Sequence, residues 1–344
     1  MSMMGYRLHR WREDPAWEQL PQREAGADEV LVEVEACGVG LTVLNCCNGD
    51  LADDPALLPL VPGHELVGRV VAAGTGAGQN LIGRRVVAYF YLVCGICPEC
   101  VAGRDSRCRN LGGWVGVHRD GGYAPFAVLP ARNALPVPDA LDPVAATVVP
   151  DAVATPVHIC RTRAKAAPDD RMVVIGAAGG VGIHLVQVAQ LYGARVAGLD
   201  VGQRKLAAVE QLGATAVDSH DFAAVDPHAL WPDGPPTVVV DLLGTTASLA
   251  WAAAALGMGG RLVVVTTFPG RTLPLDPRDF VLRELSVVGS RYASRAEVGL
   301  AADLVASGRV RPVIGTVTGP DGVLDVHRQL REGALLGRGA LRWT

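Results

Sequence analysis

The second half of the chain alternates short apolar runs with helical stretches, and this alternation limits the possible folds more than any other feature. The apolar runs are RMVVIGA (171–177), ARVAGLD (194–200), TVVVDLLG (237–244), RLVVVT (261–266) and LSVVGS (285–290). Between the first two runs, side chains recur at roughly helical spacing at Val181, Leu185, Val188 and Tyr192. Strands that alternate with helices form a parallel, doubly wound sheet. The sequence therefore predicts an α/β domain with a crossover helix after its first strand.

The first predicted strand runs into a glycine-rich turn, IGAAGGVG (175–182), which opens the crossover helix. Glycines there let the backbone approach a pyrophosphate, and the helix N-terminus offers unpaired N–H donors to its charge. The second strand ends in Asp200, whose carboxylate can accept both ribose hydroxyls and repel a 2′-phosphate. The sequence therefore predicts a dinucleotide site that prefers NAD(H) over NADP(H). The alternative is a tight strand–helix turn that binds no cofactor. The expected cofactor contacts in this segment are Gly176, Gly179, Gly180, Val181, Gly182, Asp200 and Lys205.

The first 150 residues have a different sequence pattern. From Val30, VLVEVEA alternates apolar and acidic residues as a half-exposed strand does, and short runs broken by Gly and Pro follow for about a hundred residues. This pattern predicts a β-rich domain over residues 1–150. The α/β domain then covers 151–292, and residues 293–344, with a further helix and short strands, return to the first domain.

Four of the eight cysteines lie within fifteen residues, at the spacing C-x2-C-x2-C-x7-C. Four thiolates this close suit a closed tetrahedral zinc site with no open position, which is a structural rather than a catalytic site. Unmetallated thiols and an iron–sulfur cluster are the alternatives, and the former would be an oxidation liability. The sequence predicts one structural zinc per chain, held by Cys94, Cys97, Cys100 and Cys108.

Composition excludes several classes of partner. The chain has 344 residues, 49% of them hydrophobic, a formal net charge of −4 and no block of Lys and Arg, so nucleic acid is not an expected partner. We find no apolar run of the roughly 18 residues that a membrane span needs, and Arg7, Arg10 and Arg12 stand where a signal peptide needs an apolar core. A cytoplasmic protein without a membrane partner is expected.

The four-cysteine motif followed by the glycine-rich turn resembles the zinc-containing alcohol dehydrogenase branch of the medium-chain dehydrogenase/reductase superfamily. The likeness covers essentially the whole chain and extends to PGHELVGRVVAAG (62–74) and GSRYASRAE (289–297). It implies a GroES-like catalytic domain, interrupted by a Rossmann domain, with the active site in the cleft between them. It also implies that Arg295 reaches the cofactor, and that subunits pair along the edge strand near LSVVGS into a homodimer or homotetramer.

The resemblance exposes a departure at the catalytic zinc site. The family stretch that matches GVGLTV usually reads G-V-C-H-T-D, and its cysteine binds the metal; here Gly40 stands at that position and only Thr42 survives. The family's other ligand positions hold His64, Glu65 and Asp151. A catalytic zinc is therefore expected to be absent, although a His and two carboxylates could bind a metal more weakly.

Each surviving residue also has a plain structural explanation. His64 could be a histidine buried by packing, Glu65 a structural carboxylate and Asp151 a helix N-cap. Thr42 is more readily a hydrogen-bonding site residue. Cys46 and Cys47 are possible substitute ligands, but they lie six or seven residues too late in the sequence.

These inferences predict an NAD(H)-dependent oxidoreductase that acts on a small or medium organic substrate. Without a Lewis acid, the alkoxide that develops from a simple ketone loses several kcal/mol of stabilisation, whereas a conjugated C=C–C=O or an iminium ion needs less help. The favoured hypothesis is a zinc-independent reductase of an activated C=C or C=N bond, with catalytic residues Thr42, His64, Glu65 and Asp151. The alternatives are an alcohol or carbonyl dehydrogenase with an atypical metal site, and a dinucleotide-binding protein without turnover.

Overall fold

The computed structural model describes residues 2–266, 270–273 and 275–343. The chain divides into two compact units, the first comprising Met1–Ala154, Ala293–Gly308 and Ile314–Thr344, and the second Thr155–Tyr292 and Arg309–Val313. The sequence assigned residues 309–313 to the first domain, and this was wrong. The Val313 N–H donates to His184 Nε2 at 3.0 Å, and the Gln187 side chain bonds the Arg311 backbone, which ties this segment to the second unit.

The first unit is built on a seven-stranded sheet with a separate antiparallel pair. The sheet order is β14-β15-β3-β4-β5-β7, with β6 pairing β3, and the two remaining strands β1 and β2 pair with each other. All pairings in the sheet are antiparallel except β14 with β15. The strands are β1 (Ser2–Arg7), β2 (Ala16–Pro21), β3 (Glu29–Val39), β4 (Glu65–Ala73), β5 (Arg85–Ala88), β6 (Phe126–Pro130), β7 (Ala134–Pro136), β14 (Ile314–Thr318) and β15 (Arg338–Arg342).

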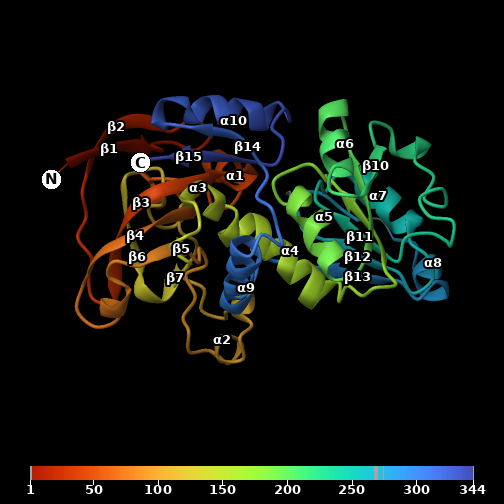
Figure 1. Cartoon of the computed structure of the whole chain (residues 1–344), viewed down its shortest axis with the longest axis horizontal. Coiled ribbons are helices and arrows are strands. Elements are labelled where there is room, and N and C mark those ends of the chain that lie inside the picture. Colours follow the sequence, from red (N-terminus) through yellow and green to blue (C-terminus); the bar gives the residue numbers. More distant parts are fainter. Residues whose placement is uncertain (1, 267–269, 274, 344) are drawn as a thin grey trace. The chain divides into compact units, whose positions relative to one another are not determined.

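Short helices of the first unit connect these strands (Figure 1). They are α1 (Leu41–Asn48), α2 (Pro98–Val101), α3 (Pro143–Ala146), α9 (Arg295–Ala306) and α10 (Val323–Arg331). The α9 helix begins with a capping box, in which Ser294 and Glu297 bond each other's backbone N–H groups. The predicted β-rich first domain is confirmed.

The second unit contains the predicted parallel sheet, with strand order β10-β9-β8-β11-β12-β13. The predicted crossover helix is α5, which is followed by α6, α7 and α8 (Figure 1). The sequence analysis missed the edge strand β10, which is short and largely exposed. The elements are β8 (Arg171–Ile175), α5 (Gly182–Leu191), β9 (Arg195–Asp200), α6 (Gln203–Glu210), β10 (Thr215–Asp218), β11 (Val238–Asp241), α7 (Thr246–Ala255), β12 (Arg261–Val264), α8 (Pro277–Leu282) and β13 (Ser286–Gly289).

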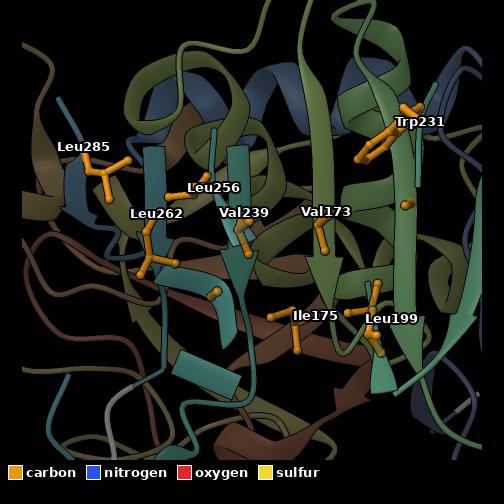
Figure 2. Packing of buried hydrophobic residues seen from close by; sticks show 11 residues of the cluster. Val173, Ile175, Leu199, Trp231, Val239, Leu256, Leu262 and Leu285 are labelled. Atoms are coloured by element: carbon orange, nitrogen blue, oxygen red, sulfur yellow. The ribbon is translucent and has the colours of Figure 1, made fainter. Parts of the chain in front are cut away.

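The core of the second unit lies against this sheet (Figure 2). Ile175 and Leu199 are register partners on β8 and β9 and lie together near the carboxyl ends of both strands. The other buried members of the cluster include Val173, Trp231, Val239, Leu256, Leu262 and Leu285. Because these strands are buried on both faces, their sequences read as continuous apolar runs. This packing holds the carboxyl ends of β8 and β9, where the glycine-rich turn and Asp200 lie, in a defined register.

One helical run is longer and more apolar than the sequence analysis expected. Pro143–Arg163 is continuous through α3, α4 (Ala154–His158) and two π-helical turns, and its mean hydropathy over 18 residues is 1.2. By length and composition alone it could cross a membrane, so the expectation of no such run was wrong. However, 89% of that window is buried inside the protein, as in a core helix.

Candidate functional site

Two elements of the first unit bring three of the four predicted catalytic residues together. Glu65 is the first residue of β4, and His64 directly precedes it. Gly63 has φ +98, which only glycine adopts readily, and so lets the chain turn sharply into the strand. Asp151 lies in the π-helical turn η5 (Val149–Val153). One ligand atom from each of His64, Glu65 and Asp151 lies within 4.8 Å of the others.

Asp151 is therefore not a helix N-cap, and that alternative was wrong. The N-cap of this helical run is Asp142, whose side chain accepts from the Ala145 N–H. Asp151 instead sits within the turn that a backbone bond from Val153 N–H to Val148 C=O widens to π geometry. Such turns are rare and occur often at functional sites.

A fourth residue, Arg338, lies in the middle of this group. Its Nε donates to Glu65 Oε2 at 2.9 Å and its Nη2 donates to Glu65 Oε1 at 2.7 Å, which makes a two-pronged ion pair. Nη2 also donates to Asp151 Oδ2 at 2.9 Å. The guanidinium thus joins the two carboxylates that the family resemblance assigns to the metal.

All four side chains are almost completely shielded from solvent. The exposed fractions are 2% for His64, 0% for Glu65, 8% for Asp151 and 4% for Arg338. Burial alone would lower the pKa of Arg338, but the charges of Glu65 and Asp151 outweigh it and raise that pKa above its ordinary value. Arg338 therefore remains a cation. Removing one partner of a buried ion pair typically costs about 3–5 kcal/mol, because it leaves an uncompensated charge.

His64 belongs to the same hydrogen-bonded group. Its Nε2 lies 3.4 Å from Asp151 Oδ2, which accepts a hydrogen bond from Nε2 when that nitrogen carries the proton. The imidazole also packs edge-on against Phe90, with ring centroids 4.7 Å apart. The packing role that the sequence left open for His64 is present together with a polar one.

Two glycines, one on β3 and one directly after it, make room for these side chains. Gly38 is the register partner of Glu65, and a Cβ on Gly38 would lie 2.9 Å from Glu65 Cβ and collide with its carboxylate. Gly40, two residues on, directly follows β3; a Cβ there would overlap Cζ and Nη1 of Arg338 and lie 2.8 Å from Nη2. Real Cβ atoms do not approach other atoms this closely, so a side chain at residue 40 would displace the guanidinium.

As arranged, the group does not fit a divalent metal. The oxygens that a metal would need already accept from Arg338, and the fixed guanidinium charge would repel a second cation. The thiolate of the family pattern is missing at Gly40.

The remaining predicted site residues lie apart from this hydrogen-bonded group. Thr42, in the first turn of α1, is half-buried and makes no side-chain hydrogen bond to any residue that the structure describes. Cys46 donates to the Gly116 carbonyl, and burial raises the pKa values of both Cys46 and Cys47, the latter to about 12. Neither thiol belongs to a metal-ligating cluster within the described part of the chain, so neither replaces the lost cysteine.

The four clustered cysteines fit a structural zinc. Their sulfurs lie within 4.8 Å of one another, with Cys97 to Cys100 at 3.5 Å and Cys94 to Cys108 at 3.6 Å. A tetrahedral site with Zn–S bonds of about 2.3 Å requires sulfur separations of about 3.8 Å. Backbone hydrogen bonds from Arg109 and Cys100 hold the pKa of Cys97 at about 6, whereas burial raises that of Cys100 to about 12. A metal bound here would displace a proton from Cys100.

The cysteine lobe is joined to the start of α9. Asp105 lies between the third and fourth cysteines, and its Oδ2 accepts from the backbone N–H of Arg295 at 3.0 Å. The Arg295 Nε is buried without a hydrogen-bond partner among the described residues. A buried donor of this kind is costly unless an acceptor reaches it.

The predicted cofactor turn has the expected backbone form in the second unit. Gly176 has φ +80, and a Cβ on Gly182 would lie 2.9 Å from Cα of Ala177 and collide with the Gly176 carbonyl, so the turn packs tightly where α5 begins. Asp200 ends β9, and its Oδ2 accepts from the Ala178 N–H at 2.8 Å. Its Oδ1 accepts from the Val201 N–H at 2.8 Å and lies 3.5 Å from Lys205 Nζ. Each oxygen retains a further lone pair for a ligand.

Sequence reasoning missed Arg338. The only signal was an arginine at the start of the short run RGALR, which ends in a second arginine, Arg342. The β3–β15 register, in which Gly339 pairs with Val39 and Ala340 with Gly38, places Arg338 opposite Gly40.

Comparison with known proteins gives consistent matches. The alcohol dehydrogenase GroES-like domain matches residues 26–139, and the zinc-binding dehydrogenase domain matches residues 180–307. An alcohol dehydrogenase from Geobacillus stearothermophilus is 33% identical over 328 residues, 94% of each chain. An acryloyl-coenzyme A reductase from Metallosphaera sedula is 31% identical over 261 residues, 75% of this chain and 76% of that relative. The crystal structure of AibC has a TM-score of 0.90 at 30% identity and covers 100% of this chain and 96% of AibC.

Proposed function

The chain belongs to the zinc-type alcohol dehydrogenase branch of the medium-chain dehydrogenase/reductase superfamily and is an NAD(H)-dependent oxidoreductase, and from this premise we propose that it reduces an activated C=C or C=N bond without a catalytic metal. The observation that carries the proposal is the Arg338 guanidinium bound to both Glu65 and Asp151. It uses the oxygens on which a Lewis acid would depend. One of the relatives is an acryloyl-coenzyme A reductase, whose named substrate is a conjugated thioester. This relative supports the proposal that the substrate contains an activated C=C bond.

The chemistry follows from where charge develops. NADH supplies the hydride when bound. In a conjugated carbonyl the β-carbon accepts the hydride, the π bond of the C=C unit breaks, and its electron pair moves through the α-carbon to the oxygen to give an enolate. The α-carbon then takes a proton, which we assign to the imidazolium form of His64, acting directly or through the Thr42 hydroxyl and leaving a neutral imidazole. His64 regains its proton from solvent. A simple ketone instead requires the site to stabilise a localised alkoxide.

The cofactor assignment rests on the second unit and on α9. The Asp200 carboxylate, at the end of β9, is positioned by the backbone of the glycine-rich turn, and its negative charge disfavours a 2′-phosphate. The buried, unpartnered Nε of Arg295 is a suitable donor for a cofactor phosphate. Asp200 therefore favours NAD(H) over NADP(H), and Arg295 supports the binding of a dinucleotide phosphate.

A substrate panel with NADH deuterated at C4 tests the reaction. In zinc-free buffer, we expect deuterium in the product of α,β-unsaturated carbonyls or cyclic imines, and slower NAD⁺ reduction with simple primary or secondary alcohols at saturating cofactor. Robust turnover of ordinary alcohols or ketones, with no label in any alkene or imine, would instead support the alcohol or carbonyl dehydrogenase alternative. NADH binding with no turnover of any electrophile would support the non-catalytic one.

We also propose that the protein is a homo-oligomer that pairs along β13. This strand is at the edge of the six-stranded sheet, and Val287 on it is 37% exposed. The preceding helix α8 exposes Val281 and Leu282. An edge strand with exposed apolar side chains is a template for pairing with another chain.

A further inference from the structure

We propose that Arg338 is the resident cation of this site, in the place of a catalytic metal, and that its Nη1 donates to the substrate's carbonyl oxygen. The inference rests on the proposed function for the identity of that oxygen. It also assigns a catalytic role to a residue that the sequence did not single out. Three observations carry it.

The first observation is charge matching. Glu65 and Asp151 are two buried carboxylates on separate elements, β4 and η5, and both bond the same guanidinium. Three of the four contacts to carboxylate oxygens are 2.9 Å or shorter. A cation bound by Glu65 and Asp151, with His64 beside Asp151, has the charge arrangement of a metal site, but the chain itself supplies it.

The second observation is the glycine at residue 40. The Cβ of any other residue would overlap the Arg338 guanidinium. The loss of the cysteine therefore does more than remove a ligand, because it opens the volume that the guanidinium occupies. Gly40 and Arg338 form a matched pair.

The third observation is that Nη1 of Arg338 remains available as a hydrogen-bond donor. Nε and Nη2 make all the recorded bonds to Glu65 and Asp151, while Nη1 makes no hydrogen bond to a residue that the structure describes. Nη1 lies on the Gly40 side of the guanidinium, and Gly40 itself has no side chain there. A charged donor fixed before the reaction stabilises the enolate oxygen most, because it needs no reorganisation as the charge develops.

The first test measures metal binding and does not depend on turnover. Co²⁺ is titrated into zinc-loaded wild type and into R338M, and the absorption of the bound ion and the metal content per chain are recorded. If Arg338 takes the metal's place, R338M binds a second metal at least tenfold more tightly than wild type. Equal second-site affinity in the two proteins, including no binding in either, overturns the inference.

R338M leaves two buried carboxylates unpaired and could fail to fold, so a second variant tests the same inference. G40A adds one methyl group beside the guanidinium and leaves every charge in place. Gly299 on α9 is the matched control, because a Cβ there meets nothing within 4 Å. We expect kcat for a conjugated carbonyl to fall at least tenfold in G40A, with the Kd for NADH changed less than twofold and G299A unchanged. A kcat within twofold of wild type in G40A, or a loss confined to NADH binding, overturns the inference. If wild type reduces no conjugated substrate, the proposed function fails, and the Co²⁺ titration still decides whether Arg338 replaces the metal.

Discussion

At the scale of single residues, the absence of a Cβ at Gly40 leaves the volume that the Arg338 guanidinium occupies. Gly38 and Gly40 lie two apart on one segment, and each leaves room for a charged side chain that reaches in from another strand. A cysteine at residue 40 and the present position of Arg338 exclude each other.

Gly40→Cys alone is therefore expected not to create an efficient alcohol dehydrogenase. The new Cβ displaces Arg338, and Val43 and Asn45 still stand where the family resemblance expects the aspartate and histidine that support the metal. We expect kcat/KM for simple alcohols with NAD⁺ to rise by less than tenfold. A larger gain, measured in zinc-containing buffer, would mean that the thiolate was the sole missing part.

Asp200→Ser is expected to narrow the preference for NADH over NADPH. The change removes a charge that repels a 2′-phosphate and an acceptor for ribose hydroxyls, and a hydrogen bond to a charged group contributes about 1.5–3 kcal/mol. The ratio of the two kcat/KM values should fall at least about tenfold. Asp200 also accepts from the Ala178 and Val201 N–H groups, so Asp200→Asn, which keeps an acceptor, is the control for local structure. A wild type that prefers NADPH contradicts the role given to Asp200.

At the scale of elements, the cysteine lobe is a local structure joined to α9. We expect about one zinc per chain, because the four-thiolate set is complete and the second set is filled by Arg338. Brief chelation should leave activity largely intact, since the four thiolates enclose their metal. Elemental analysis and a rate assay before and after chelation check both points. Two zincs per chain in protein never exposed to chelator would refute the count.

The helix α10 carries a buried histidine that should make the first unit sensitive to acid. Burial lowers the pKa of His327 from 6.5 to about 4; the nearby Asp14 opposes this shift and Arg331 adds to it. Because the pKa is lowered, the folded protein favours the neutral form of His327. The stabilisation that neutral His327 provides is complete above pH 6.5 and is lost as the pH falls toward 4. Between pH 7 and pH 5 the loss is about 2 kcal/mol.

Unfolding in urea at several pH values tests this prediction. His327→Gln does not titrate and can still bond the Tyr123 hydroxyl, which lies 2.9 Å from His327 Nε2. The variant should lose less stability than wild type between pH 7 and pH 5. Parallel curves for the two proteins would show that His327 does not contribute.

At the scale of the whole molecule, the exposed edge of the parallel sheet predicts self-association. Val287→Lys places a charge on β13 and should reduce the mass measured by light scattering, ideally to that of one chain. Val317, on the β14 edge of the other sheet and 49% exposed, supplies the control Val317→Lys, which should keep the wild-type mass. A monomeric wild type, or a mass unchanged by Val287→Lys, would refute pairing along β13.

The sequence by itself determined the features that depend on neighbouring residues. The buried strands β8, β11 and β12 could be predicted because burial on both faces requires continuous apolar runs. The zinc ligands could be predicted because their spacing is local. The edge strand β10 could not, because it is four residues long and largely exposed, so it carries no apolar pattern.

Only the tertiary structure decided the chemistry of the site. The sequence identified the loss of a ligand at Gly40, and His64, Glu65 and Asp151 came from the family resemblance. The residue that bonds both Glu65 and Asp151 is Arg338, which is 273 residues from Glu65 along the chain. No local pattern can encode such a contact, because it depends on the register of β15 against β3 and on an empty volume that exists once both strands are paired.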